Sequence, residues 1–173
     1  HLEITRDIAM KFNATYGETF VIPEAEINAN VPTVVGIDGR KMSKSYDNAI
    51  YLGDRGEELR KKVESMFTDP QRQRKSDPGR PEVCNVFAFH NLYSAAEDVA
   101  QIDRDCRGAA IGCVQCKKRL AGRIAEGLKP IHDKQDYYRS HIREVHDIIA
   151  DGNERARQVA RATMAEVRDA IRI

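Results

Sequence analysis

Hydrophobic positions recur at helical spacing in the first third of the chain. Residues 2–13 place their apolar side chains on one face and predict an amphipathic helix. A second helix is expected from Asp54, because Glu57 follows three positions later in the pattern of a capping box. Its apolar face contains Leu59, Val63, Met66 and Phe67.

From about residue 84 to the end, the chain reads as one helix after another. Apolar stripes continue through this region, and Pro130 suits the first turn of a new helix. The run Asp151-Gly152-Asn153 predicts a break before the last helix. We therefore expect a helical bundle in the C-terminal part.

Strand-like and loop-like segments lie before this bundle. Residues 20–23 (FVIP) and the β-branched residues 31–37 (VPTVVGI) read as short strands. Residues 69–82 contain three prolines without periodicity and read as a polar loop. The fold class is therefore expected to be mostly α, with the tail of an α/β unit first. The domains are expected at residues 1–68 and 69–173.

Composition and charge limit the classes of protein that fit. The 173 residues are 41% hydrophobic and 32% charged, which is a globular balance with enough apolar content for a core. A net charge of +1 means that any contact with nucleic acid depends on a local patch. No apolar run approaches the roughly 18 residues that span a bilayer. The chain begins inside an expected helix, so we interpret it as a piece of a longer protein.

The stretch GRKMSKS contains the residue types that bind a polyphosphate. The ammonium groups of Lys41 and Lys44 can offset charge on a leaving pyrophosphate. The hydroxyls of Ser43 and Ser45, with the loop N–H groups, can donate hydrogen bonds to its oxygens. The loop follows an expected strand, where open α/β sheets place their ligands. The alternative is an ordinary solvated turn.

KMSKS resembles the nucleotide-loop motif of the class I aminoacyl-tRNA synthetases. The segments HLEITRDIAMKFN, YGETFVIPEA, DPGRPEVCNVF and GCVQCKKRLA are similar to the C-terminal half of a bacterial tryptophanyl-tRNA synthetase. The resemblance implies that Lys41, Met42, Ser43, Lys44 and Ser45 bind ATP, and that Lys41 and Lys44 are catalytic. It implies a Rossmann-like catalytic domain at 1–68 and a helical anticodon-binding domain at 69–173.

The resemblance also implies an activity and its partners. We expect a ligase that activates L-tryptophan with ATP and Mg²⁺ and transfers it to tRNA(Trp). We expect a cytoplasmic homodimer with no membrane contact. No His-x-Gly-His motif is found here, so the fragment alone is expected to be inactive. A tyrosyl-tRNA synthetase fragment and a non-catalytic, metal-stapled tRNA-binding module are the alternatives.

Four cysteines are spaced as C-x21-C-x6-C-x2-C, at Cys84, Cys106, Cys113 and Cys116. Four thiolates with one C-x-x-C pair suit a soft metal centre, either a [4Fe–4S] cluster or a tetrahedral Zn²⁺. Disulfides are disfavoured in a chain that resembles a cytoplasmic enzyme. The resemblance favours the iron–sulfur cluster, and zinc and free thiols remain alternatives.

Basic residues surround the last two cysteines. Lys117, Lys118 and Arg119 directly follow Cys116 and are candidates for contact with the tRNA phosphate backbone. The alternative is a solvated helix face. His90 has no histidine at metal-ligand spacing and is expected to be a structural or surface residue.

Overall fold

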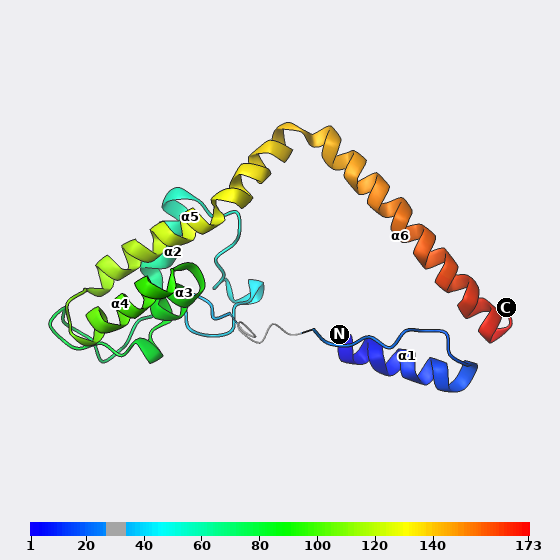
Figure 1. The fold of residues 1–173 in the computed structure, drawn as a ribbon, viewed down its shortest axis with the longest axis horizontal. Coiled ribbons are helices and arrows are strands. Elements are labelled where there is room, and N and C mark those ends of the chain that lie inside the picture. The colour runs from blue at the N-terminus through cyan, green and yellow to red at the C-terminus, as the bar shows by residue number, and fades with distance from the viewer. Residues whose placement is uncertain (27–33) are drawn as a thin grey trace. The chain divides into compact units, whose positions relative to one another are not determined.

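The computed structural model describes residues 1–26 and 34–173 and is mostly helical, which confirms the expected fold class (Figure 1). The α-helices are α1 (Leu2–Tyr16), α2 (Gly56–Ser65), α3 (Asn85–Tyr93), α4 (Ala96–Arg107), α5 (Cys113–Ser140) and α6 (Ile142–Ile171). Two short 3₁₀ helices are η1 (Lys44–Tyr46) and η2 (Pro81–Val83). None of the described helices is long and apolar enough to cross a membrane.

The chain divides into two compact units. Thr33–Tyr137 supplies one, and His1–Pro32 with Tyr138–Ile173 supplies the other, each considered over its described residues. The first unit contains both the lysine–serine loop and the four cysteines. The expected domain boundary at residues 68 and 69 stays a prediction.

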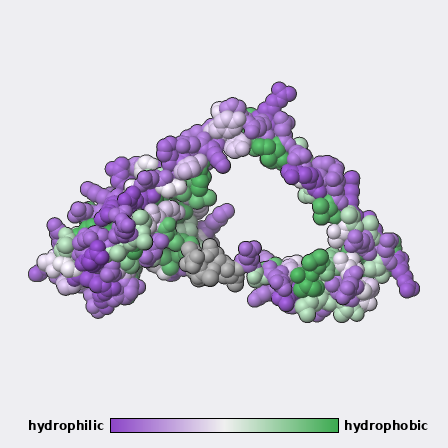
Figure 2. Space-filling model, in the orientation of Figure 1, coloured by the Kyte–Doolittle hydropathy of each residue, from purple (hydrophilic) through white to green (hydrophobic). Residues whose placement is uncertain are grey.

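The core of the unit Thr33–Tyr137 lies between α2, α3 and α5. Each helix contributes apolar side chains three or four positions apart, which places them on one face. The fully buried members are Leu59, Val63, Met66, Val86, Phe89, Leu120, Ile124 and Leu128. Hydrophilic side chains cover most of the face of this unit that Figure 2 shows. The predicted apolar face of α2 is thus confirmed for Leu59 and Val63. Met66 and Phe67 lie beyond the helix, where Met66 is buried and Phe67 is exposed.

The segment after α1 is a loop, so the predicted strand at 20–23 is wrong. The Asn13 side chain donates from Nδ2 to the Phe20 carbonyl at 2.8 Å and accepts from the Phe20 N–H at 2.9 Å. It also accepts from the Thr19 N–H at 3.1 Å. These backbone groups are satisfied by one side chain, and no neighbouring strand is needed.

The expected helix start at Pro130 and the break at 151–153 are both wrong. Pro130 lies inside α5, because losing one N–H and its hydrogen bond does not outweigh a helix of 28 residues. α6 runs unbroken through Gly152. A helical glycine costs only about 1 kcal/mol, and ion pairs support this turn, at 3.0 Å between Asp151 and Arg155 and at 2.8 Å between Glu154 and Arg157.

Asp54 does not cap α2 as the capping-box pattern predicted. Arg55 occupies the N-cap position without a side-chain cap. The buried Asp54 carboxylate instead accepts from the Tyr51 N–H at 2.8 Å and pairs with Lys62 at 2.7 Å. Lys62, a charged residue in the second turn of α2, therefore competes successfully for this carboxylate.

Candidate functional site

The lysine–serine loop follows a tight hairpin rather than a strand. Val35 and Lys41 form an isolated antiparallel bridge, and the Met42 N–H donates to the Val34 carbonyl at 3.1 Å. Gly39 closes the turn with φ of 82°, a conformation that favours glycine. Residues 31–33 of the predicted strand lie outside the described residues, and residues 34–37 form only this bridge.

Serine side chains organise the loop, and its lysines face solvent. Ser43 caps η1, because its Oγ accepts from the Ser45 N–H at 3.3 Å and lies 2.8 Å from the Ser45 Oγ. Lys41 and Lys44 are exposed, and neither ammonium forms an ion pair with a described residue. Met42 is half-buried against the core. The loop therefore presents two uncompensated positive charges on a fixed backbone.

The buried side chain of Asn48 holds the backbone of the same loop, and the sequence analysis did not identify this residue. Its side chain is 1% exposed. Its Oδ1 accepts from the Ser43 N–H at 2.8 Å, and its Nδ2 donates to the Lys41 carbonyl at 3.2 Å and to Asp38 at 2.8 Å. Only its position just after KMSKS could have drawn attention to it.

Asp38 and Arg40 complete the tip of the hairpin. Arg40 pairs with Asp38 at 2.6 Å and places its guanidinium 4.5 Å from the centre of the Tyr46 ring. The hydrogen bond from Asn48 lowers the pKa of the Asp38 carboxyl, and the bonds from Arg40 lower it further. Asp38 therefore stays ionised and binds Arg40, while the two loop lysines keep their charge available.

The four cysteine thiols gather in one region. Cys84 immediately precedes α3, and Cys106 lies in the last turn of α4. Cys113 and Cys116 lie in the first turn of α5. Burial raises the pKa of the Cys116 thiol to about 12, and the other three thiols add to the rise. Burial also raises the pKa of Cys106, with contributions from Cys84 and Cys113.

The described structure does not arrange these thiols as the ligands of a metal ion. Among the described residues, no three His, Cys, Asp or Glu side chains converge as the ligands of a single ion would. The geometry of the described residues therefore favours neither a zinc ion nor an iron–sulfur cluster. The all-thiol donor set is compatible with both.

Arg72 lies beside the thiols and was not singled out from sequence. Its Nη1 is 3.6 Å from the Cys106 Sγ and 3.9 Å from the Cys113 Sγ. Its Nη2 donates to the Ile111 carbonyl at 2.7 Å, and its buried Nε has no hydrogen-bond partner in the described chain. The guanidinium lowers the pKa of Cys106 against the effect of burial and thus favours a thiolate there.

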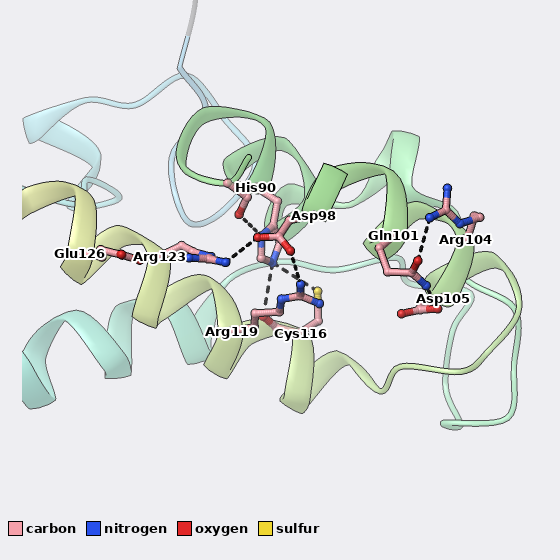
Figure 3. A network of polar contacts seen from close by, with 10 residues as sticks. His90, Asp98, Gln101, Arg104, Asp105, Cys116, Arg119, Arg123 and Glu126 are labelled. Carbon is pink, nitrogen blue, oxygen red and sulfur yellow. Dashed lines mark hydrogen bonds and ion pairs between the residues drawn. The ribbon is translucent and has the colours of Figure 1, made fainter. Parts of the chain in front are cut away.

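His90 contacts Cys116 (Figure 3). It is fully buried, and burial lowers its pKa, so it is neutral at pH 7. Its Nδ1 lies 2.8 Å from the Ser94 Oγ. Its Nε2 lies 3.4 Å from the Cys116 carbonyl and 3.5 Å from the Cys116 Sγ. His90 is therefore a structural residue, as one of the two expectations had it, and makes a polar contact with Cys116, a candidate metal ligand.

The three candidate tRNA-binding residues differ in their surroundings. Lys117 donates to the Glu64 carbonyl at 2.6 Å. Arg119 and Arg123 share Asp98, each at 2.5 Å, and join α5 to α4 (Figure 3). Of the three, Lys118 alone is exposed, and Lys117 and Arg119 are half-buried.

Lys118 borders an open cleft of about 530 Å³ beside Cys113. Three further basic side chains line this cleft, namely Arg72, Arg74 and Lys75. The cleft is therefore a basic concave surface beside Cys113.

A family model described as "tRNA synthetases class I (W and Y)" matches residues 1–129. The tryptophan–tRNA ligase of Aquifex aeolicus is 44% identical to all of this chain over 44% of its own length. The ligase of Thermotoga maritima is 43% identical over 53% of its length. The chain therefore spans about half the length of the curated relatives it matches.

Solved structures give the same result. The tryptophanyl-tRNA synthetase of Campylobacter jejuni, crystallised with ADP and tryptophan, matches the whole chain with a TM-score of 0.83 and 31% identity. The match covers 54% of that chain. Since the family model covers well over half of its residues, this chain belongs to the class I tRNA synthetases for tryptophan and tyrosine.

Proposed function

We propose that this chain is the part of a tryptophan–tRNA ligase that supplies the ATP loop and the helical tRNA-binding region. The observation that carries the proposal is the loop at residues 41–45, whose backbone is fixed and whose two ammonium groups are exposed and unpaired within the described chain. Relatives that are tryptophan–tRNA ligases favour tryptophan over tyrosine as the amino acid.

In this proposal the loop acts on the triphosphate of ATP, bound with Mg²⁺. Attack of the tryptophan carboxylate on the α-phosphorus forms tryptophanyl-adenylate and releases pyrophosphate. Lys44, and to a smaller extent Lys41, stabilise the negative charge that grows on the pyrophosphate. Ser43 and Ser45 hold the loop backbone so that its N–H groups can also donate hydrogen bonds to the pyrophosphate. The terminal ribose hydroxyl of tRNA(Trp) then attacks the carbonyl carbon of the adenylate, which forms the tryptophanyl ester and releases AMP.

ATP–pyrophosphate exchange by the full-length protein that contains this chain tests the proposal. We expect exchange that depends on tryptophan, with tyrosine as the matched comparison. Exchange with tyrosine and none with tryptophan would assign the chain to the tyrosine branch of the family. Absence of exchange with either, in a protein that binds tRNA, would favour the non-catalytic module.

We also propose that Cys84, Cys106, Cys113 and Cys116 hold a [4Fe–4S] cluster. The gathering of four half-buried thiols beside Arg72, which offsets thiolate charge, supports this proposal. When bound, the cluster would link the start of α3 to the end of α4 and the start of α5. Arg72 and His90, which contact three of these thiols, would hold them in place.

Anaerobic purification followed by iron and acid-labile sulfide analysis tests the cluster. We expect about four irons and four sulfides per chain and a loss of both in Cys116→Ser. Zinc without acid-labile sulfide would support the zinc alternative, and four titratable thiols without metal would support free cysteines.

The remaining proposals concern partners and location. We infer that the basic cleft beside Lys118 contacts tRNA(Trp), since its concave positive surface suits a phosphate backbone. Family membership also supports a homodimer in the cytoplasm with no membrane contact. Light scattering of the full-length protein tests the oligomeric state.

A further inference from the structure

We propose that Asn48 and Asn85 are positioning residues for the lysine–serine loop. This inference rests on the proposed role of the loop in ATP binding. Both asparagines are buried, at 1% and 5% exposure, and neither side chain reaches the exposed face where the lysines lie. They would act by fixing the backbone from which Lys41 and Lys44 extend.

Asn48 uses its whole side-chain amide on this loop. Its oxygen accepts from the Ser43 N–H at 2.8 Å, between the two lysines in sequence. Its nitrogen donates to the carbonyl of Lys41 itself at 3.2 Å and to Asp38 at 2.8 Å. The three bonds bracket the first half of KMSKS, and a side chain of another shape or polarity cannot make all three.

Asn85 holds the other side of the hairpin. It is the first residue of α3, and its Nδ2 donates to the Gly36 carbonyl. The Gly36 N–H in turn donates to the Arg40 carbonyl at 2.6 Å, next to Lys41. Gly36 therefore connects α3 to the residue before the motif.

Gly36 also brings the two asparagines together. A Cβ at Gly36 would overlap the Asn48 side chain and lie 2.8 Å from the Asn48 carbonyl oxygen. The hairpin backbone is thus packed against Asn48 on one side and bonded to Asn85 through its carbonyl. We call Asn48, Gly36 and Asn85 the asparagine clamp.

The clamp matters for catalysis because a lysine has a flexible stem. The position of its ammonium group depends on the backbone that carries it, and a misplacement of about 1 Å at a reacting centre can cost on the order of 10² in rate. The clamp also joins the loop to the helix that directly follows Cys84. Loop position is therefore set by α3 and not by the loop sequence alone.

The test uses Asn85→Asp, Asn48→Asp and Asn48→Ser in the full-length protein. The aspartates keep the shape of asparagine but remove the N–H donors. Asn48→Ser is included because an aspartate at position 48 would also be repelled by the Asp38 carboxylate. The control is Asn91→Asp, because Asn91 is an exposed asparagine on the same helix and bonds only to the Phe87 carbonyl within α3.

Active-site titration, with a burst of adenylate formation, counts the competent sites in each preparation. We expect kcat per competent site in pyrophosphate exchange to fall on the order of 10–10², with a smaller change in KM for tryptophan. The Asn91 control should match the wild type. A variant with fewer competent sites but a normal kcat per site would show a merely structural role and overturn the proposal.

Two further measurements decide the clamp. Combining Asn85→Asp with Lys44→Ala should give less than the product of the two single effects, because both act through the same ammonium group. Fully multiplicative effects would contradict this. Hydrogen exchange at the amides of residues 41–46 needs no catalytic activity and should speed up in the clamp variants, while α5 stays unchanged. If hydrogen exchange at residues 41–46 is unchanged in the variants, the proposed clamp is wrong. If the wild type shows no pyrophosphate exchange with tryptophan, only the proposed function is wrong.

Discussion

Lys44 begins η1, where Ser43 caps the turn and leaves the Lys44 ammonium exposed. Because the loop backbone is held by Ser43 and Asn48, Lys44→Ala should leave stability unchanged. It should slow tryptophan activation by roughly 10²–10³, the usual cost of losing one group that stabilises transition-state charge. Lys41→Ala should cost less.

Pyrophosphate exchange measures the effect of Lys44→Ala, with Lys61→Ala as the control on the exposed surface of α2. Near-normal pyrophosphate exchange by the Lys44 variant would support the alternative that the loop is an ordinary solvated turn.

Gly36 is the residue whose replacement should disturb the hairpin most directly. Gly36→Ala would force a Cβ into Asn48, and overpacking of this kind costs about 1–3 kcal/mol in the free energy of unfolding. Gly122→Ala on α5 meets nothing within 4 Å and should be neutral or slightly stabilising. Urea denaturation of both variants measures the difference, and equal stabilities would contradict the packing seen here.

Residues of the site differ in how far sequence could identify them. Lys41, Ser43, Lys44 and Ser45 form one contiguous motif whose chemistry can be read directly. Arg72 and Asn85 act on partners about 34 to 49 positions away, so no local pattern indicates them. Their roles depend on which loops the fold brings together.

At the scale of elements, apolar periodicity located the helices but not all of their ends. It predicted α1 and α2 because their apolar residues follow the helical repeat, although only Ala9 of α1 is buried in the described structure. It failed at Pro130 and Gly152, where a local preference worth a few kcal/mol at most is outweighed by long helices. It failed at residues 20–23, where the side chain of Asn13 satisfies the backbone.

Asp69 organises the loop before η2 and should make stability depend on pH. Its carboxylate is 4% exposed and accepts from the Arg80 guanidinium at 2.7 Å and from the Gln71 N–H at 3.0 Å. The hydrogen bond from Arg80 is the main cause of its strongly lowered pKa. An unfolded aspartate has a pKa of about 3.9, so this stabilisation is complete above that pH and is lost as the pH falls below it.

Asp69→Asn should therefore lower the melting temperature at pH 7, and the gap to the wild type should narrow below about pH 4. Asp147→Asn, at an exposed position on α6, is the control. A gap that stays constant between pH 7 and pH 3 would contradict the role of the ionised carboxylate.

Two neighbouring residues at the start of α5 are expected to have different roles, Lys118 in tRNA binding and Arg119 in stability. Lys118→Gln should weaken tRNA binding by the full-length protein and reduce the slope of log affinity against log salt by about 1. Arg119→Gln should instead lower thermal stability, because Arg119 pairs with Asp98 of α4.

Lys134→Gln, at an exposed position farther along α5, is the control for tRNA binding. An unchanged salt slope in the Lys118 variant would place the tRNA contact elsewhere.

At the scale of the whole molecule, one compact unit contains both candidate sites. Thr33–Tyr137 includes the lysine–serine loop and the four cysteines. Asn85 joins them, since it follows Cys84 and bonds to Gly36. Sequence located each motif separately, and its resemblance to a known family indicated a common protein. The physical connection between the motifs required the fold.

Charging of tRNA by the full-length protein tests the central claim most directly. With ATP and Mg²⁺, the wild type is expected to attach tryptophan to tRNA(Trp), and Lys44→Ala is expected to charge it far more slowly while binding the same tRNA. Attachment of tyrosine to tRNA(Tyr), or binding of tRNA(Trp) without any charging, would contradict the account.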